Sequence, residues 1–300
     1  MNLRSVDLNL LVIFDALMAE RNVTRAANRI AMSQPAMSNA LARLREAFRD
    51  ELFVRTAKGM EPTPRAIELG EAVRQILRQT ERLLVSDLEF DPTSSERTFN
   101  ARMSDLIGFL ALPTLLRALR VEAPAVRLDI VHLSPEQTVK ALEADQLDFA
   151  LSMDLKHVNT IRSTVLFEDQ MVCVMRSGHR LDKDGLTIQD FIDGDHLRVA
   201  MSPTDIRFVD NALSVHGLQR RIVANVPHWL LIPPVLHETD LLAVVSGKLA
   251  GRFSNQGISV RPLPFDSTPF NWRLYWHRRH DGSHPHRWIR SLVQNACASI

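Results

Sequence analysis

Residues 22–64 constrain the fold of this chain more than any other segment, because two short helical patterns flank a tight break. Thr24 can cap a first helix at 25–31 by accepting a hydrogen bond from a free backbone N–H. Ser33 is a second N-cap candidate, and Pro35 lies in the first turn of the next helix, where a missing N–H costs little. Two helices joined this tightly indicate a helix-turn-helix.

The second helix has an apolar face and a polar face. Its apolar side chains recur at helical spacing and are predicted to face inward; they are Ala36, Met37, Ala40, Leu41, Leu44 and Phe48. The polar side chains elsewhere on the helix are Gln34, Ser38, Asn39, Arg43 and Arg45. Gln and Asn can pair with adenine, Arg with guanine, and Ser with several bases or with phosphate, so this helix is predicted to lie in the DNA major groove. An upstream helix at 8–20 supplies a further core stripe of Leu10, Leu11, Phe14, Leu17 and Met18.

A β-hairpin is predicted directly after the second helix. Residues 51–55 form a short apolar run suited to a strand, and Gly59 is free to take the positive φ of a hairpin tip. Arg55 and Lys58 would then meet phosphates or the minor groove. The segment is interpreted as a winged helix-turn-helix, with predicted DNA-binding residues Ser33, Gln34, Pro35, Ser38, Asn39, Arg43, Arg55 and Lys58.

The charge of the chain supports local rather than general nucleic-acid binding. The formal net charge of all 300 residues is only +1. The first 65 residues hold ten Lys and Arg against seven Asp and Glu, a modest excess that favours phosphate contact. Hydrophobic residues make up 45% and charged residues 24%, so an ordinary globular protein of two or three domains is expected.

Several other classes of protein and site are not indicated. No apolar run is long enough to span a bilayer and no signal-peptide pattern follows Met1, so no membrane partner and a cytoplasmic location are expected. Cys173 and Cys297 lie far apart and are predicted to be buried as small apolar side chains. The sequence has no Gly-rich phosphate loop, Walker segment or triad spacing, so no cofactor and no catalytic residue is predicted.

A long helix is predicted from Arg65 to Asp87. Apolar residues recur along it at mixed spacings of three and four: Ile67, Leu69, Val73, Ile76, Leu77, Leu83 and Leu84. Nothing nearby in the sequence obviously covers this stripe, and a long amphipathic helix usually buries its stripe against a partner helix. A dimer would let two recognition helices read two half-sites. Packing of the stripe onto the chain's own C-terminal domain is the alternative.

The pattern changes after a polar, turn-rich segment at 90–96. Strands and helices then alternate, which favours α/β sandwiches. The predicted strands are 98–103, 126–133, 149–153, 171–175 within the run 165–176, 197–201, 221–226, 242–245 and 272–277. The predicted helices are 107–123, 135–144, 188–192, 204–215 and 285–298.

Several motifs together resemble those of LysR-type transcriptional regulators. They are Ser33-Gln34-Pro35-Ala36 with Ser38, Leu41 and Leu44, then Leu52-Phe53-Val54-Arg55 and Pro62-Thr63-Pro64. A narrower resemblance, to the branch of nodulation regulators and regulators of aromatic-compound degradation, rests on Phe90-Asp91-Pro92, Arg97-Thr98-Phe99-Asn100 and Val226-Pro227-His228-Trp229. The chain departs from the family at Arg45-Glu46, where many members carry Glu directly after Leu44, and at Asn39, where several carry Arg.

The resemblance implies a fold and a function for the whole chain. It implies a winged helix-turn-helix at 1–64, a dimerising linker helix at 65–90 and an effector-binding domain at 91–300. That last domain would hold two Rossmann-like α/β lobes of periplasmic-binding-protein type, about 97–166 plus 269–300 and about 169–264, with crossovers near 166–169 and 262–268. The protein would regulate transcription from promoter DNA as a homodimer or homotetramer, with a small organic effector and RNA polymerase as further partners.

The predicted effector site lies at the carboxyl ends of the strands, where ligands of such folds tend to bind. Ser104 and Asp105 follow the first strand, and a hydroxyl at a helix N-terminus suits a carboxylate. In the aromatic-responsive regulators that the chain resembles, the positions matching Ser104 and His228 lie at the effector cleft. The remaining candidates are inferred from their positions after strands: Met153, Ser202, Thr204 and Trp229. Capping of helices by Ser104 and Ser202 is the alternative, as is a turn role for His228.

Asp169 bears on the charge of the effector. It lies where related aromatic-acid sensors can carry a base, and an acid there would repel a carboxylate ligand. The expected effector is therefore a small organic molecule, with aromatic molecules among the candidates and its charge left open. An enzyme or ligand carrier with an accessory DNA-binding head is the alternative function, which the absence of a catalytic constellation disfavours.

The histidine-rich stretch at 277–286 invites a metal hypothesis. Its spacing does not match a zinc signature, and Arg278 and Arg279 would oppose a cation. A solvated turn before the last helix is predicted instead, and no metal site.

Overall fold

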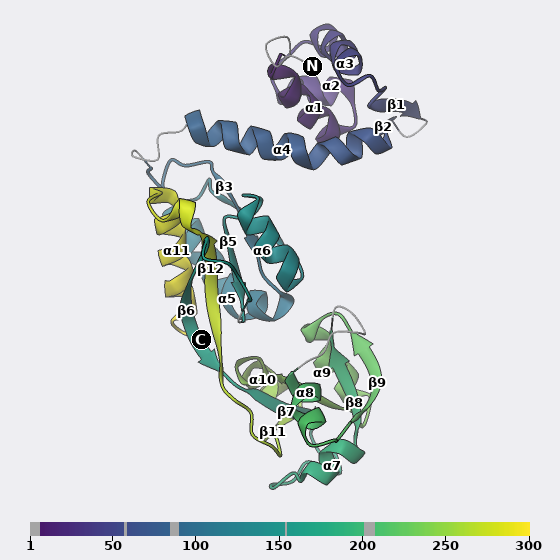
Figure 1. The fold of residues 1–300 in the computed structure, drawn as a ribbon, viewed down its shortest axis with the longest axis vertical. Coiled ribbons are helices and arrows are strands. Elements are labelled where there is room, and N and C mark those ends of the chain that lie inside the picture. The colour runs from purple at the N-terminus through teal and green to yellow at the C-terminus, as the bar shows by residue number, and fades with distance from the viewer. Residues whose placement is uncertain (1–6, 57–58, 85–89, 154, 201–207) are drawn as a thin grey trace. The chain divides into compact units, whose positions relative to one another are not determined.

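Helices make up the N-terminal part of the chain, and two mixed β-sheets with helices make up the rest (Figure 1). The computed structural model describes residues 7–56, 59–84, 90–153, 155–200 and 208–300. The chain divides into two compact units, Met1–Ser86 and Asp87–Ile300, and each is described by itself. No helix within the described ranges is both long enough and apolar enough to cross a membrane.

The N-terminal unit holds three short helices, a two-stranded wing and a long helix. These are α1 Asn9–Glu20, α2 Val23–Arg29, α3 Gln34–Phe48, β1 Phe53–Thr56, β2 Gly59–Pro62 and α4 Pro64–Leu84, with β1 and β2 antiparallel. Phe14 is fully buried at the centre, with its ring centroid 5.8 Å from that of Phe53 and 6.3 Å from that of Phe48. The predicted winged helix-turn-helix is confirmed, and Gly59 takes the expected positive φ, 119°.

Local hydrogen bonds set the starts of α2 and α3. Ser33 caps α3 as predicted, because its Oγ accepts a hydrogen bond from the Ala36 N–H at 3.3 Å. The predicted cap of α2 by Thr24 is wrong. Asn22 takes that role: its Oδ1 accepts from the Arg25 N–H at 3.0 Å, and the helix begins at Val23. An Asn side chain caps at least as well as Thr, so the upstream residue starts the helix earlier.

Part of the apolar stripe of α4 is covered by the N-terminal unit itself. The side chains that pack into its core are Leu69, Val73 and Leu77. Gly70 lies so close to α1 that an added Cβ would come within 3.2 Å of the Met18 Cε. The expectation that nothing nearby covers this stripe is therefore wrong for Leu69, Val73 and Leu77, which pack within the N-terminal unit.

A second apolar side of α4 stays exposed. Ile67 is 61% exposed and Ile76 is 45% exposed. The side chains of Leu83 and Leu84, which the sequence analysis placed in the same stripe, lie outside the described residues. One face of the long helix thus packs against its own unit. Nothing in the described part of that unit covers the other face.

The first lobe of the C-terminal unit contains a five-stranded sheet in the order β4-β3-β5-β12-β6. Its strands are β3 Thr98–Arg102, β4 Arg127–Val131, β5 Phe149–Ser152, β6 Ile161–Asp169 and β12 Phe270–His277. Strand β3 runs parallel to β4 and β5, whereas β12 is antiparallel to β5 and β6. The helices of this lobe are α5 Asp105–Glu122, α6 Pro135–Glu143 and α11 His284–Cys297.

The second lobe contains a five-stranded sheet in the order β11-β7-β10-β8-β9. Its strands are β7 Met171–Arg176, β8 Asp195–Val199, β9 Arg221–Val226, β10 Leu242–Ser246 and β11 Ile258–Pro262. Its helices are α7 Ile188–Asp193, α8 Phe208–Val215, α9 Ile232–His237 and α10 Gly247–Phe253. The predicted fold of two α/β lobes is confirmed.

Two connections join the lobes. Strand β6 ends at Asp169 and β7 begins at Met171, so Gln170 alone separates strands of different sheets. Residues 263–269 lead back from β11 to β12. The run 165–176 was predicted to hold a strand at 171–175, which β7 confirms, whereas β6, which ends within the same run, was not predicted. Three further elements of five to seven residues, which are too short for a clear periodicity, were also not predicted: α9, α10 and β11.

Both cysteines are buried, as predicted. Cys173 is 0% exposed and Cys297 is 1% exposed. Burial raises the pKa of each thiol to about 12. At neutral pH both are therefore uncharged packing groups rather than nucleophiles.

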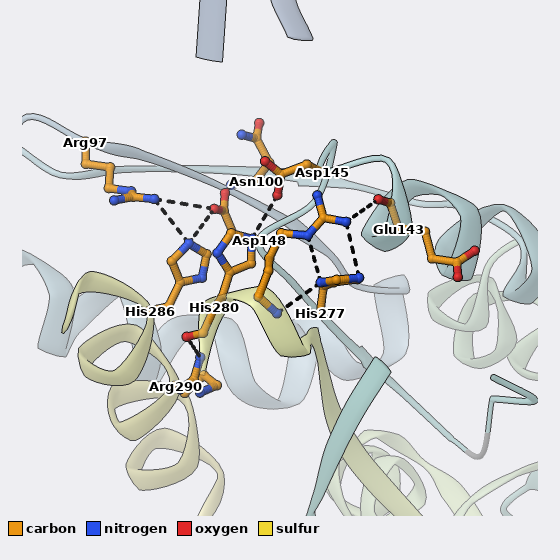
Figure 2. A network of polar contacts seen from close by, with 10 residues as sticks. Arg97, Asn100, Glu143, Asp145, Asp148, His277, His280, His286 and Arg290 are labelled. Atoms are coloured by element: carbon orange, nitrogen blue, oxygen red, sulfur yellow. Dashed lines mark hydrogen bonds and ion pairs between the residues drawn. The ribbon is translucent and has the colours of Figure 1, made fainter. Parts of the chain in front are cut away.

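Three histidines around the start of α11, His277, His280 and His286, are buried in a polar network (Figure 2). His280 Nε2 lies 2.8 Å from Asp145 Oδ1, and His286 Nε2 lies 3.2 Å from Asp148 Oδ1. The two imidazole rings stack with centroids 3.8 Å apart. The predicted solvated turn holds for Arg278, Arg279, Asp281 and Gly282, which are exposed. It does not hold for His280 and His286, because carboxylates more than a hundred residues earlier in the chain contact them. No group of three or more His, Cys, Asp or Glu among the described residues could hold a metal ion.

The buried His286 should make the stability of the C-terminal unit depend on pH. Burial lowers the pKa of His286 from 6.5 to about 4, although Asp148 opposes the shift. The unfolded chain takes up this proton at higher pH than the folded chain does. The free energy of unfolding should therefore fall as the pH drops from about 6.5 towards about 4, by on the order of 3 kcal/mol.

Thermal unfolding at a series of pH values, with His286→Gln as the comparison, measures this contribution. His196, whose pKa burial also lowers to about 4, contributes equally to both proteins. The wild type should lose more stability than the variant over this range. Parallel losses would contradict the assignment.

Candidate DNA interface and ligand cavity

Helix α3 presents a polar surface along its N-terminal half. The exposed residues there are Ser33, Gln34, Pro35, Ser38 and Asn39. Gln34 Nε2 donates to Ser38 Oγ at 3.1 Å, so these two side chains form one polar patch. Met37, Leu41 and Leu44 are buried in the core. A recognition helix needs this division, because one side must reach base edges while the other anchors it.

Two arginines and one lysine were expected to extend this surface. Arg43 is exposed on α3, and its Nη2 lies 2.9 Å from Asp7 Oδ2. An exposed ion pair of this kind is weak, so Arg43 can exchange Asp7 for phosphate or a base. Arg55 is exposed on β1 of the wing. Lys58 lies outside the described residues.

Arg45 does not belong to this surface. Its Nε donates to the Glu51 carbonyl oxygen at 2.9 Å, and its Nη2 donates to the Phe53 carbonyl oxygen at 2.8 Å. The grouping of Arg45 with the side chains able to read bases is therefore wrong. The guanidinium is turned to the main chain at the start of the wing.

A cavity of about 270 Å³ lies in the C-terminal unit, and both lobes contribute to its wall. The wall residues outside the second sheet and its helices are Met153, Trp229, Thr268 and Phe270. The others are Met171, Leu197, Arg198, Val199, Val209, Arg220 and Val244. Most are apolar, and aromatic rings and thioethers are among them. A concave, mainly apolar wall with a few polar groups is the usual character of a small-molecule site.

Two arginines supply the charge in this wall. The Arg220 side chain is 3% exposed, and its Nε donates to Asp210 Oδ1 at 2.8 Å. Arg198 Nη1 lies 3.7 Å from Asp210 Oδ2, and its Nε donates to Asn225 Oδ1 at 3.1 Å. One carboxylate thus faces two guanidinium groups. Guanidinium groups beside an apolar cavity favour a ligand with an anionic group.

Ser104 and Asp105 lie at the N-terminal end of α5 and are not part of the cavity wall. Ser104 is 9% exposed at the N-cap position, but its hydroxyl makes no capping hydrogen bond. Asp105 Oδ2 accepts a hydrogen bond from the Leu230 N–H at 3.1 Å. Asp105 Oδ1 is buried and has no hydrogen-bond partner in the described part of the chain. The Asp105 carboxylate therefore connects the first lobe to the second.

His228 is exposed, directly before the short 3₁₀ helix η3 Trp229–Leu231. It lies within electrostatic reach of His132 in the first lobe. Burial, then the positive charges of Arg102 and His228, lower the pKa of His132, and Asp105 opposes them. His132 of the first lobe and His228 of the second thus belong to one polar group. His228 directly precedes Trp229, which lines the cavity. The sequence analysis misses His132, because no motif marks it.

Asp169 does not face the cavity. It is 6% exposed at the end of β6. Its carboxylate accepts hydrogen bonds from the Gln170 N–H at 2.8 Å, the Lys248 N–H at 3.2 Å, the Trp272 Nε1–H at 3.2 Å and the Ser246 hydroxyl. The expected repulsion of a carboxylate ligand by Asp169 is therefore wrong, because donors from both lobes already surround this charge.

The predicted effector residues thus separate into groups. Met153 and Trp229 line the cavity, whereas Ser104, Asp105 and His228 lie beside it. Ser202 and Thr204 lie outside the described residues. Arg198, Arg220 and Asp210 were not predicted. Arg198 alone has a weak sequence signal, since it lies between two apolar residues of a strand.

Family models match both parts of the chain. Residues 8–67 match the bacterial regulatory helix-turn-helix protein model of the lysR family, and residues 93–298 match the LysR substrate binding domain. The chain belongs to the LysR family of transcriptional regulators. The resemblance inferred from the sequence motifs is confirmed.

Similar proteins support this assignment for the regulator over its whole length. The transcriptional activators NagR of Ralstonia sp and NahR of Pseudomonas putida are each 35% identical to it, over 97% and 98% of both chains respectively. Nodulation protein D 2 of Sinorhizobium fredii is 34% identical over 98% of this chain and 94% of that protein. These relatives are named as activators or nodulation proteins, and the regulator is not an enzyme.

Solved structures agree with the fold. A probable transcriptional regulator of Pseudomonas aeruginosa matches with a TM-score of 0.81 and 35% identity, over 98% of each chain. Full-length CbnR complexed with target DNA matches with a TM-score of 0.68 over 97% of this chain and all of that chain, at 16% identity, which supports the fold alone. The regulator therefore combines a DNA-binding unit with a substrate-binding domain, as LysR-family proteins do.

Replacing Arg55 by Ala should weaken DNA binding by the regulator and flatten its salt dependence. Loss of one phosphate contact lowers the slope of log K against log salt concentration by about 0.9. Binding to DNA from upstream of its gene, titrated at several salt concentrations, measures the slope. Arg74→Ala, at an exposed arginine of α4 paired with Glu71, is the matched control. An unchanged slope for the Arg55 variant would remove Arg55 from the DNA contacts.

Proposed function

We propose that the regulator binds a small aromatic acid in its cavity and that this ligand alters its action on promoter DNA. The observation that carries the proposal is the pair Arg198 and Arg220 in a mainly apolar wall. A carboxylate can pair with a guanidinium group while an aromatic ring packs against Trp229 and Phe270. A volume of about 270 Å³ is at the small end for ligand sites, which favours a small effector.

The DNA-binding residues are proposed from the exposed surface of α3 and the wing. We assign base contacts and positioning contacts to Ser33, Gln34, Pro35, Ser38, Asn39 and Arg43. Arg55 and Lys58 are assigned to phosphate or the minor groove, Lys58 from the sequence alone. The support is the exposure of those that the structure describes, together with hydrogen-bonding groups suited to base edges and phosphates.

A second copy of the chain is proposed to pack on the exposed apolar side of α4. Ile67 and Ile76, 61% and 45% exposed, supply apolar surface on a long helix, and such surface is normally covered. A dimer, or a tetramer built from it, would present two recognition helices to two half-sites. Contact with RNA polymerase and a cytoplasmic location are proposed from the role of the family in transcription.

The effector signal is proposed to pass through the contact between lobes beside the cavity. Trp229 lines the cavity, and the adjoining Leu230 donates its N–H to Asp105 of the first lobe. A ligand that shifts Trp229 would also shift Leu230. It would thereby favour one lobe orientation over another, which is the requirement for a population shift.

Aromatic carboxylates such as benzoate should raise the melting temperature of the regulator, whereas the corresponding primary amides should not. Arg198→Gln should weaken ligand affinity by on the order of tenfold or more, because a charge-assisted hydrogen bond is lost. Arg221→Gln, at a 76% exposed arginine outside the wall, should leave affinity unchanged. Thermal shift and calorimetric titration supply these measurements.

The same measurements distinguish two positions for the ligand, the cavity and the N-terminal end of α5. Ser104→Ala should leave the thermal shift intact, because Ser104 is not in the cavity wall. Loss of the shift in the Ser104 variant, with the shift retained in the Arg198 variant, would move the effector to the end of α5. A stronger response to the amides than to the acids would refute an acidic effector.

Asp105→Ala should reduce the change in reporter transcription that effector produces, because Leu230 loses its acceptor. Asp105→Asn keeps an oxygen that can accept this hydrogen bond and should retain most of the response. Transcription with and without effector, alongside ligand affinity measured separately, checks this prediction. A full response in the Ala variant would show that the contact carries no signal.

A further inference from the structure

The turn between α3 and β1 has a backbone that residues other than glycine rarely adopt. Arg49 has a φ of 53° and Leu52 a φ of 56°, both in the left-handed region. Leu52 is also fully buried. Such residues persist only where the surrounding structure fixes them. The turn therefore needs contacts that hold it, and these contacts decide where the wing begins.

Arg45 and Asp50 provide those contacts. Arg45 Nε donates to the Glu51 carbonyl oxygen at 2.9 Å, and Nη2 donates to the Phe53 carbonyl oxygen at 2.8 Å. Asp50 Oδ1 accepts from the Leu52 N–H at 2.7 Å. Two side chains at the end of α3 thus hold consecutive residues of the main chain on both sides of the strained Leu52.

The same contacts extend to both ends of the wing. Phe53 is the first residue of β1, so the bond from Arg45 fixes the origin of the strand that carries Arg55. Asp50 Oδ1 also accepts from Thr63 Oγ1 at 2.7 Å. Thr63 Oγ1 in turn accepts from the Ala66 N–H at 3.1 Å, at the start of α4. The entry to the wing is thus tied to α3 by Arg45, and its exit is tied to Asp50, two residues after that helix.

We propose that Arg45 is a positioning residue for DNA binding, which sets the wing against the recognition helix without contacting DNA itself. Its Nε and Nη2 are directed to main-chain carbonyls, and Nε also lies 3.2 Å from Glu51 Oε2. The planar guanidinium fork can bridge two carbonyls in one plane, whereas the single ammonium of Lys cannot. Arg45, where the chain departs from many family members, would thus act in placing the wing rather than in reading bases.

A charge-preserving substitution tests this role. Arg45→Lys keeps the charge but loses the fork, and Arg45→Gln loses both. Both should weaken DNA affinity to a similar extent, on the order of tenfold, because each breaks the pair of charge-assisted hydrogen bonds. Arg43 is the matched comparison on the same helix: it is exposed, so Arg43→Lys should retain more affinity than Arg43→Gln. Wild-type affinity for Arg45→Lys beside weak binding for Arg45→Gln would overturn the proposal, because charge alone would then matter.

A double variant tests the route through the wing. Arg45→Gln should lower DNA affinity less in the Arg55→Ala background than in the wild type, because the wing contact is already lost in that background. Additive losses would show that Arg45 contacts DNA independently. Wild-type affinity for Arg55→Ala would also overturn the proposal, since the wing would have no contact to position. Circular dichroism melts check that each variant is folded. If Arg45→Gln unfolds the N-terminal unit, the same comparison is made with Arg45→Lys, alone and combined with Arg55→Ala.

Discussion

The arrangement of the two lobes depends on one buried carboxylate. Asp169 ends β6 in the first sheet, accepts hydrogen bonds from Ser246 and the Lys248 N–H in the second lobe, and accepts another from Trp272 in β12. A buried charge is tolerated only where donors surround it, so these segments must meet at this point for the chain to fold. The cavity lies between the lobes that Asp169 joins, and its shape therefore follows from this meeting.

Features with local causes could be predicted from the sequence. Ser33 caps α3 and Pro35 lies in its first turn, because capping depends on residues three positions apart. Gly59 similarly marks the tip of the wing. The failure at Thr24 has the same origin, since Asn22 offers equivalent chemistry two residues upstream. The covering of α4 by α1 was not predictable, because it depends on how the helices pack and not on their order.

The charged parts of the candidate site could not be predicted, because they form between distant segments. Arg220 and Arg198 meet Asp210 only because β8 lies beside β9 in the second sheet. His286 meets Asp148 across more than a hundred residues, and a solvated turn was expected in its place. Met153 and Trp229, inferred from their positions after strands, line the cavity. The roles of these two residues, Ser104 and His228 in ligand binding stay predictions.

The charged residues of the cavity wall all lie in one lobe, and this bears on which substitutions would change ligand recognition. Arg198, Arg220 and their partner Asp210 all lie in the second lobe, while the first lobe contributes Met153 and Phe270. The first lobe is also the one that directly follows the long helix in sequence. Substitutions at Arg198 or Arg220 would thus change the charge that a ligand meets while leaving Met153 and Phe270, the first lobe's part of the wall, unchanged.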